Sequence, residues 1–199
     1  VWIRDFLPQR IGRPCRVMLF AYNSSPAKAA AAMRLDEHAR MLLSCLKDKR
    51  KDSPLRPIVF LCHSLGGIVV KSVSIHRTLD PAYGSIVKST RLLVFFATPH
   101  LGGNYSGIGD IAAKIVRTGL GTPSNDLLDG LKAGSRDVIR RFEQARHLPA
   151  NCLVISFYET ENYGRFGLIV EKDSAVLNLS DDRERKVALK ANHSKICKF

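Results

Sequence analysis

One serine in this chain lies where a nucleophile is expected. Ser64 belongs to the motif His-Ser-Leu-Gly-Gly, which directly follows the apolar run 57–61 and precedes the apolar run 68–70. Where a strand turns sharply into a helix, a serine on the turn is strained and its hydroxyl is exposed at the carboxyl edge of a parallel sheet. Cys62 occupies the position two before the serine, where glycine is usual, and it is small enough for this turn. We therefore expect Ser64 to attack carbonyl carbon.

A serine hydroxyl is a weak nucleophile, so it needs a base, and the base needs a third group that fixes its tautomer. On this type of turn the acid and then the histidine follow the serine in the chain. His193 lies in a loop after the last expected strand and is the predicted base, with His100 as the alternative. His63 is expected to point elsewhere because it is adjacent to the serine. The remaining histidines are expected on the surface or in the core, namely His38, His76 and His147.

The predicted acid follows the strand that comes two after the strand leading to the serine. Residues 152–157 form that later strand, and Glu159 is the first carboxylate beyond it. Asp173 is the rival, and Asp110 and Asp126 are weaker candidates. The competing interpretation of Glu159 is a solvated carboxylate in a loop. With Glu159 as the acid, the chain has the order serine, acid, histidine that is typical of folds with this type of turn.

The negative oxygen of a tetrahedral intermediate needs backbone N–H donors. The N–H of Leu65, the residue after the serine, is the predicted first donor. The second donor normally comes from a His-Gly-type loop after an early strand, and the sequence contains no such loop. Gly102 and Gly103 follow the wrong strand for this role. The sequence thus predicts half of an oxyanion hole.

Apolar strands alternate with helical segments along the chain. This alternation predicts an α/β fold with a doubly wound, mostly parallel sheet. The long interval between the strands at 91–96 and 152–157 predicts a helical, lid-like insertion at about 102–150 within a single domain, 1–199. The expected strands are residues 16–22, 57–62, 91–96, 152–157 and 168–170. The expected helices are residues 27–49 and 66–78. Helical pieces are expected over 111–146, and a helix or turn over 185–191.

The charge balance is strongly basic, with 31 Lys and Arg against 18 Asp and Glu and a formal charge of +13. Such a balance favours anionic partners, for example an anionic membrane surface. The densest clusters, 47–51 and 181–186, are mixed in sign and are interpreted mainly as solvated surface. No basic motif is interleaved with aromatic residues, so no specific nucleic-acid binding is expected.

The five cysteines are spread out and show no C-x-x-C spacing. This pattern argues against a disulfide framework and against a zinc site, and it favours a reducing compartment. No apolar run approaches about 18 residues and no signal peptide is visible, so we expect an intracellular, cytoplasmic protein. The chain begins at Val1 and not at Met, as a piece of a longer protein would.

Several motifs together resemble one known family. The chain is similar to the serine esterase/lipase-like α/β-hydrolase domains grouped with the serine active site containing protein family, many of which lie at the N-terminus of fungal NLR-like proteins with NACHT or ankyrin domains. The segments that carry the resemblance are residues 2–8, 21–24, 62–71, 95–102, 156–160, 173–177 and 192–199. They cover nearly the whole chain in the order of the family.

The resemblance implies an α/β-hydrolase fold that lacks its first strands, and a hydrolase acting on carboxylic esters of lipids or other acyl compounds without metal or cofactor. It supports Ser64 as nucleophile and His193 as base, and it supports Glu159 less strongly because Asp173 also lies in a family-like segment. Family members usually carry a strand and a His-Gly-Leu-Gly-Gly-like loop upstream of the segment that starts here at Trp2. The alternative interpretation is a catalytically impaired signalling or binding module within a larger protein.

Overall fold

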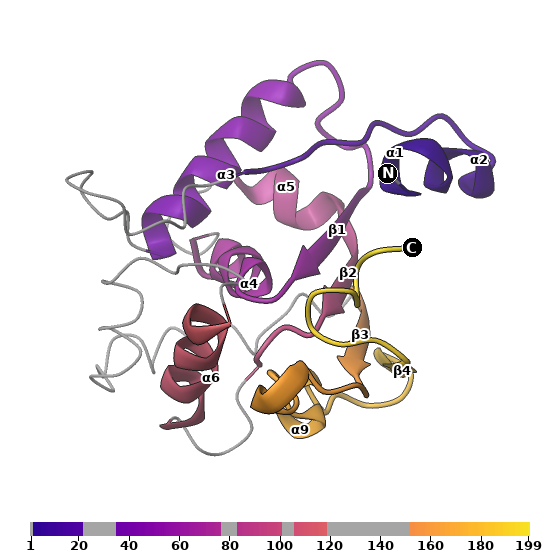
Figure 1. Ribbon diagram of the computed structural model, residues 1–199. Helices are drawn as coiled ribbons and strands as arrows, with labels where there is room; N and C mark the ends of the chain where they lie inside the picture. The colour runs from indigo at the N-terminus through magenta and orange to yellow at the C-terminus, as the bar shows by residue number, and fades with distance from the viewer. Residues whose placement is uncertain (1, 22–34, 77–82, 101–105, 119–151) are drawn as a thin grey trace.

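A computed structural model describes residues 2–21, 35–76, 83–100, 106–118 and 152–199 (Figure 1). Most strands are followed by helical segments, as the sequence predicts. The elements in chain order are α1 (Trp2–Asp5), α2 (Leu7–Ile11), α3 (Leu35–Lys49), β1 (Ile58–His63), α4 (Gly66–His76), α5 (Gly84–Ser89), β2 (Thr90–Phe96), α6 (Ser106–Arg117), β3 (Leu153–Glu159), the short 3₁₀ helix η2 (Gly164–Phe166), α9 (Lys172–Ala175) and β4 (Glu184–Leu189).

The described strands form one parallel sheet in the order β1-β2-β3-β4. The register aligns His63 with Phe96, Phe96 with Phe157, and Glu159 with Leu189. All four strands therefore end at the same edge of the sheet. In parallel α/β sheets this carboxyl edge is where functional residues gather.

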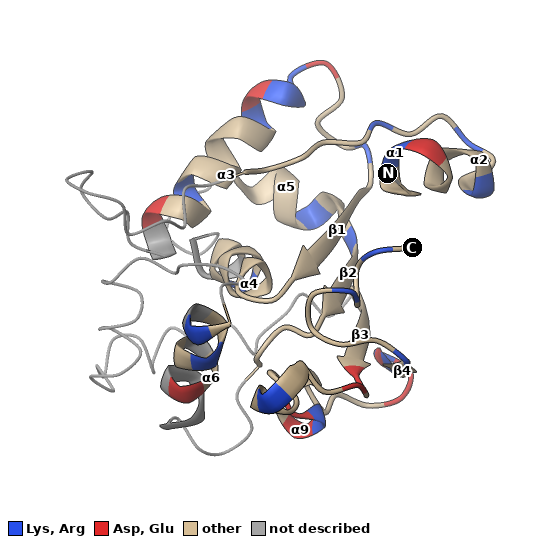
Figure 2. Ribbon diagram, viewed as in Figure 1, with Lys and Arg blue, Asp and Glu red and all other residues tan. Residues whose placement is uncertain are grey.

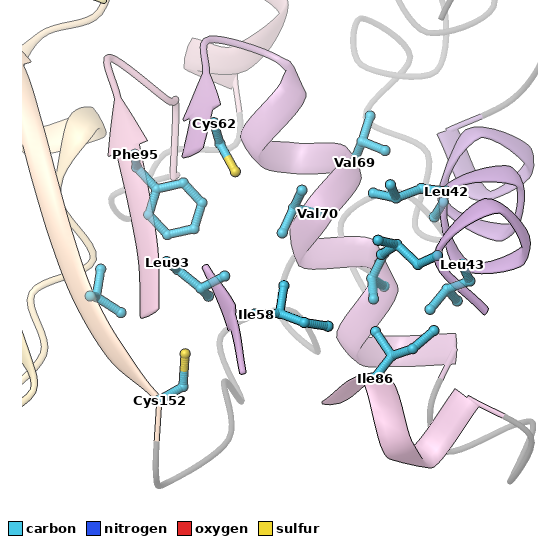
Figure 3. Packing of buried hydrophobic residues seen from close by; sticks show 14 residues of the cluster. Leu42, Leu43, Ile58, Cys62, Val69, Val70, Ile86, Leu93, Phe95 and Cys152 are labelled. Atoms are coloured by element: carbon cyan, nitrogen blue, oxygen red, sulfur yellow. The ribbon is translucent and has the colours of Figure 1, made fainter. Parts of the chain in front are cut away.

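The sheet is covered on both faces, and its strands alternate between the two coverings. Leu93 and Phe95 of β2 belong to a buried cluster with α3, α4 and α5, whereas Val94 and Phe96 belong to a second cluster with α6 and α9. Successive side chains of a strand point to opposite faces, so one apolar strand supplies both layers. Figure 3 shows the first cluster, in which Leu42 and Leu43 of α3 face Val69 of α4, and Val70 lies on the side of α4 that faces the strands.

The predicted strand at 16–22 is wrong for its described part. Residues 14–21 have no regular structure, and Leu19 is 92% exposed. Its apolar composition favours an extended conformation, but a strand exists only through the ladder it makes with a neighbour. In the described part of the chain β1 pairs with β2 alone, and no strand pairs with residues 14–21.

Two further predictions of secondary structure are wrong near the C-terminus. Residues 185–191, expected as a helix or turn, mostly belong to β4. Arg185 and Lys186 of this strand are exposed, which suits the edge strand of a sheet, whereas Glu184 at its start is buried. Residues 168–170 form no strand, yet Ile169 and Val170 are fully buried. The apolar run therefore predicted burial correctly but not backbone pairing.

The remaining expected elements agree with the structure where it describes them. The helices at 27–49 and 66–78 are observed as α3 and α4, while residues 27–34 and 77–78 lie outside the described part. The lid-like insertion at about 102–150 is described only over 106–118, where it forms α6, and its other residues lie outside the description. No helix among the described residues is long and apolar enough to cross a membrane.

Candidate active site

Ser64 occupies a sharp turn between β1 and α4. Its φ of 53° lies in the left-handed region, which costs a non-glycine residue about 1–3 kcal/mol and persists only where surrounding contacts enforce it. The Ser64 N–H donates to the Phe96 carbonyl at 2.9 Å, and the Gly67 N–H donates to the Ser64 carbonyl at 3.1 Å. These contacts hold the serine at the carboxyl edge of the sheet, directly before the first turn of α4.

Gly67 allows α4 to approach the loop that follows β2. A Cβ at this position would lie 2.3 Å from Thr98 Oγ1 and 2.9 Å from Thr98 Cβ, closer than real Cβ atoms come to their neighbours. Thr98 itself is fully buried, and Ala97 before it also has a positive φ of 44°. The second glycine of the motif is thus required by packing rather than by its own backbone angles.

We expect Gly67→Ala to lower the free energy of unfolding by about 1–3 kcal/mol, because the new methyl group overpacks the contact with Thr98. Urea denaturation measures the effect. Gly84→Ala is the matched control, since nothing lies within 4 Å of a Cβ there and alanine favours helix. The packing argument fails if Gly67→Ala is as stable as wild type, and a partial recovery in Gly67→Ala/Thr98→Ala would support it.

His193 brings its imidazole to the serine from the loop after β4. Its Nε2 lies 2.9 Å from Ser64 Oγ, and its Nδ1 lies 3.0 Å from Glu159 Oε1. The carboxylate can only accept, so Nδ1 carries the proton and Nε2 is left to accept from the serine hydroxyl. All three side chains are buried, with Ser64 the most accessible at 9% exposure. This is the hydrogen-bonded order in which an acid orients a base toward a nucleophile.

Glu159 is the last residue of β3 and is only 1% exposed. Its Oε1 accepts a second hydrogen bond, from the Val170 N–H at 2.8 Å, while Oε2 has no hydrogen-bond partner among the described residues. A buried carboxylate is costly unless such donors compensate it. The rival Asp173 lies on α9 with an exposed side chain. Asp110 is exposed on α6, and Asp126 lies outside the described residues.

His100, the alternative base, occupies a different buried environment. Its Nδ1 lies 3.3 Å from Lys71 Nζ, and its ring meets Phe95 edge-on at 4.5 Å between centroids. Burial, together with the charge of Lys71, holds the pKa of His100 well below its usual value. Its backbone N–H donates to the Ser174 carbonyl of α9. The hydrogen bond to Ser64 is made by His193, whereas His100 contacts Lys71 of α4 and Ser174 of α9.

The expectation that His63 points away from the site is wrong. Its Nε2 lies 2.9 Å from the carbonyl oxygen of His193, and the two rings are 5.0 Å apart. Burial, and then the nearby His193, lower the pKa of His63 to about 4, so that it is neutral at physiological pH. No pattern in the sequence signalled this contact, because 130 positions separate the two residues.

Acidification is expected to destabilise the protein. In the unfolded chain His63 and His100 take up protons near pH 6.5, whereas in the folded protein His63 does so only near pH 4 and His100 well below its usual value. Between these limits the unfolded state binds more protons, so the free energy of unfolding falls as the pH drops from about 6.5 to 4. For His63 the loss is at most about 3 kcal/mol.

Urea denaturation at a series of pH values between 7 and 4 tests this expectation. His63→Gln removes one of the two titrating groups, so its stability should depend less steeply on pH than that of wild type. A wild-type stability that stays constant over this range would contradict the expectation.

The described residues offer little for metal or redox chemistry. They contain no group of three or more His, Cys, Asp or Glu side chains that could hold a metal ion. The five cysteines are free thiols, and burial raises the pKa of Cys62, beneath the turn, far above its usual value. Cys62 therefore behaves as a small apolar side chain at the end of β1.

Comparison with known proteins gives two kinds of match. Residues 31–118, less than half of the chain, match the family described as "Putative serine esterase (DUF676)". The chain is also 36% identical over 56 residues to the zebrafish (Danio rerio) Protein SERAC1 and 34% identical over 47 residues to the human (Homo sapiens) one. These segments cover 27% and 24% of this chain but only 8% and 7% of those proteins.

Among solved structures, the mature form of the Bacillus licheniformis lipase BlEst2 is similar to this chain. The TM-score is 0.56 at 18% sequence identity, and the similarity covers 81% of this chain and 68% of the lipase. Together with the parallel sheet and its flanking helices, this similarity shows that the chain has an α/β-hydrolase fold. The fold predicted from the sequence is thereby confirmed.

Proposed function

We propose that this chain is a serine esterase that cleaves carboxylic esters through an acyl-enzyme intermediate. The observation that carries the proposal is the buried series of hydrogen bonds from Ser64 Oγ to His193 Nε2 and from His193 Nδ1 to Glu159. The matches to a serine esterase family and to a lipase structure support the same class of reaction. Fold alone would not suffice, because one fold serves many functions.

In the proposed reaction, Ser64 Oγ attacks the ester carbonyl carbon while His193 Nε2 takes the hydroxyl proton. Glu159 stabilises the resulting imidazolium through Nδ1–H. Collapse of the tetrahedral intermediate breaks the ester C–O bond, and His193 returns its proton to the leaving alcohol. Water then attacks the acyl-Ser64 ester with His193 again as base, which releases the carboxylic acid and restores the serine.

The Leu65 N–H is the proposed first donor to the developing oxyanion. Leu65 follows the nucleophile and directly precedes α4, whose N-terminal backbone N–H groups favour negative charge. A second donor is expected from a His-Gly-type loop, for which this sequence has no counterpart. Loss of one such donor lowers the rate by about 10²–10³-fold. The strength of catalysis therefore depends on whether a further segment supplies that donor.

The substrates that we propose are acyl esters, with lipids as the favoured class. The net charge of +13 attracts anionic surfaces, and Figure 2 shows Lys and Arg on helices around the molecule rather than in one stripe. This distribution supports general attraction to an anionic membrane surface more than recognition of one ligand. The alternative proposal is a hydrolase-fold binding or signalling module within a larger protein.

A fluorophosphonate probe should label the wild-type protein and leave Ser64→Ala unlabelled, because the probe reacts only with an activated serine. In-gel detection of the bound probe, with circular dichroism as a check on folding, measures this. Ser24→Ala is the control for nonspecific labelling and should behave as wild type. If folded wild-type protein takes up no probe, the esterase proposal is wrong and the binding module replaces it.

Glu159→Gln should lower the rate of ester hydrolysis by about 10⁴-fold, the order found when the orienting acid of such a triad becomes neutral. The amide no longer selects the tautomer of His193 or stabilises its cation. Hydrolysis of p-nitrophenyl butyrate measures the rate. Asp173→Asn is the matched control, and its rate should stay within about twofold of wild type. The reverse result would move the acid to Asp173.

A further inference from the structure

His63, the residue directly before Ser64, contacts the backbone of His193, the proposed base. The acceptor is the His193 carbonyl oxygen, which has no proton to donate, so the 2.9 Å contact requires the proton of His63 on Nε2. Because its low pKa of about 4 keeps His63 neutral, this nitrogen carries the single ring proton over the whole neutral range. His63 is therefore a fixed hydrogen-bond donor toward the backbone of His193.

Two adjacent residues, His63 at the end of β1 and Ser64 on the turn, thus contact His193 at two different places. Ser64 contacts the ring of His193, and His63 contacts its backbone carbonyl. The contacts of the ring with Ser64 and Glu159 do not by themselves fix the position of the His193 backbone. A contact on the backbone restricts its movement relative to Ser64, because that contact comes from His63, the last residue of β1 and the neighbour of Ser64.

The loop that carries His193 is attached to the body of the protein at several further points: the Thr160 and Glu161 N–H groups donate to the Ala191 carbonyl at 3.3 Å, and Ile196 is fully buried in the second core cluster. It follows the edge strand β4 and is neither strand nor helix. The Lys195 and Ile196 N–H groups donate to the Asn192 carbonyl within the loop, and Trp2 Nε1 donates to the Cys197 carbonyl at 2.9 Å. Among the backbone contacts of this loop described here, the one from His63 comes from the residue directly before Ser64.

We propose that His63 is a positioning residue, which fixes the backbone of His193 so that its imidazole stays within hydrogen-bond reach of Ser64. This role rests on the proposed esterase function. Small displacements of a catalytic group matter, since a misplacement of about 1 Å can cost about 10²-fold in rate. A neutral donor also suits the position, because a lysine or arginine there would repel the imidazolium that forms on His193 in each step.

Three substitutions separate the hydrogen bond from the bulk of the ring. His63→Phe keeps an aromatic ring and loses the donor. His63→Gln places an amide N–H the same number of bonds from Cβ as Nε2, whereas His63→Asn places it one bond shorter, as Nδ1 is. We expect His63→Phe and His63→Asn to lower kcat for p-nitrophenyl butyrate by about 10–100-fold with KM within about twofold, and His63→Gln to stay within about threefold of wild type.

Trp2→Phe is the matched control, because it removes a different hydrogen bond to the same loop. Its kcat should stay within about threefold of wild type if the link to the turn, rather than general anchoring of the loop, is what matters. Equal losses in Trp2→Phe and His63→Phe, or a wild-type kcat in His63→Phe, would overturn the positioning role. The role would also be overturned if the kcat of His63→Gln were no higher than the kcat of His63→Asn while both variants are folded.

Hydrogen exchange distinguishes this inference from the proposed function. The amides of residues 192–197 should exchange faster in His63→Phe than in wild type and His63→Gln, whatever the activity. If the amides of residues 192–197 exchange at the same rate in all variants, His63 does not stabilise the loop, even if the wild type is an active esterase. Absence of fluorophosphonate labelling in wild type would instead reject the esterase function, and with it the role of His63 in the reaction.

Discussion

The hydrogen bond from the Ser64 N–H to the Phe96 carbonyl is the contact on which the site depends. Ser64 departs from the β conformation there, and its left-handed φ is tolerated because the neighbouring strand still pairs with its backbone. The same parallel register brings the ends of β3 and β4 to this edge. His193, just after β4, then contacts Ser64, and Glu159, at the end of β3, contacts His193.

The burial of these side chains has an energetic cost that other groups of the protein must compensate. Glu159 is almost completely enclosed, so its charge has to be compensated by donors inside the protein. His193 and the Val170 N–H both supply them on Oε1. The apolar residues of the segment around Val170 predict a strand. The segment instead supplies a backbone N–H donor to Glu159. The hydrogen bond to Glu159 also fixes the orientation of the His193 ring. The low local dielectric strengthens this hydrogen bond.

Much of the architecture could be predicted from the sequence. The strands β1, β2 and β3 follow from continuous apolar runs, since a strand buried on both faces needs no alternation. Ser64, Glu159 and His193 follow from the order of residues after successive strands. Residues 16–21 and β4 were not predicted correctly, because a segment forms a strand only where a neighbouring strand pairs with it. The apolar segment at 16–21 pairs with no strand among the described residues and is irregular, whereas the charged segment beside β3 is an edge strand.

Residue types and their order along the chain determined which chemistry is available and which element carries each group. Only the tertiary structure shows which of the competing residues meet, since it buries Glu159 against His193 and leaves Asp173 exposed on α9. It also brought His63 to the backbone of His193, a contact between residues 130 positions apart. Local patterns report the conformation and burial of neighbouring residues, whereas distances between distant side chains depend on how the strands pair and where the loops return.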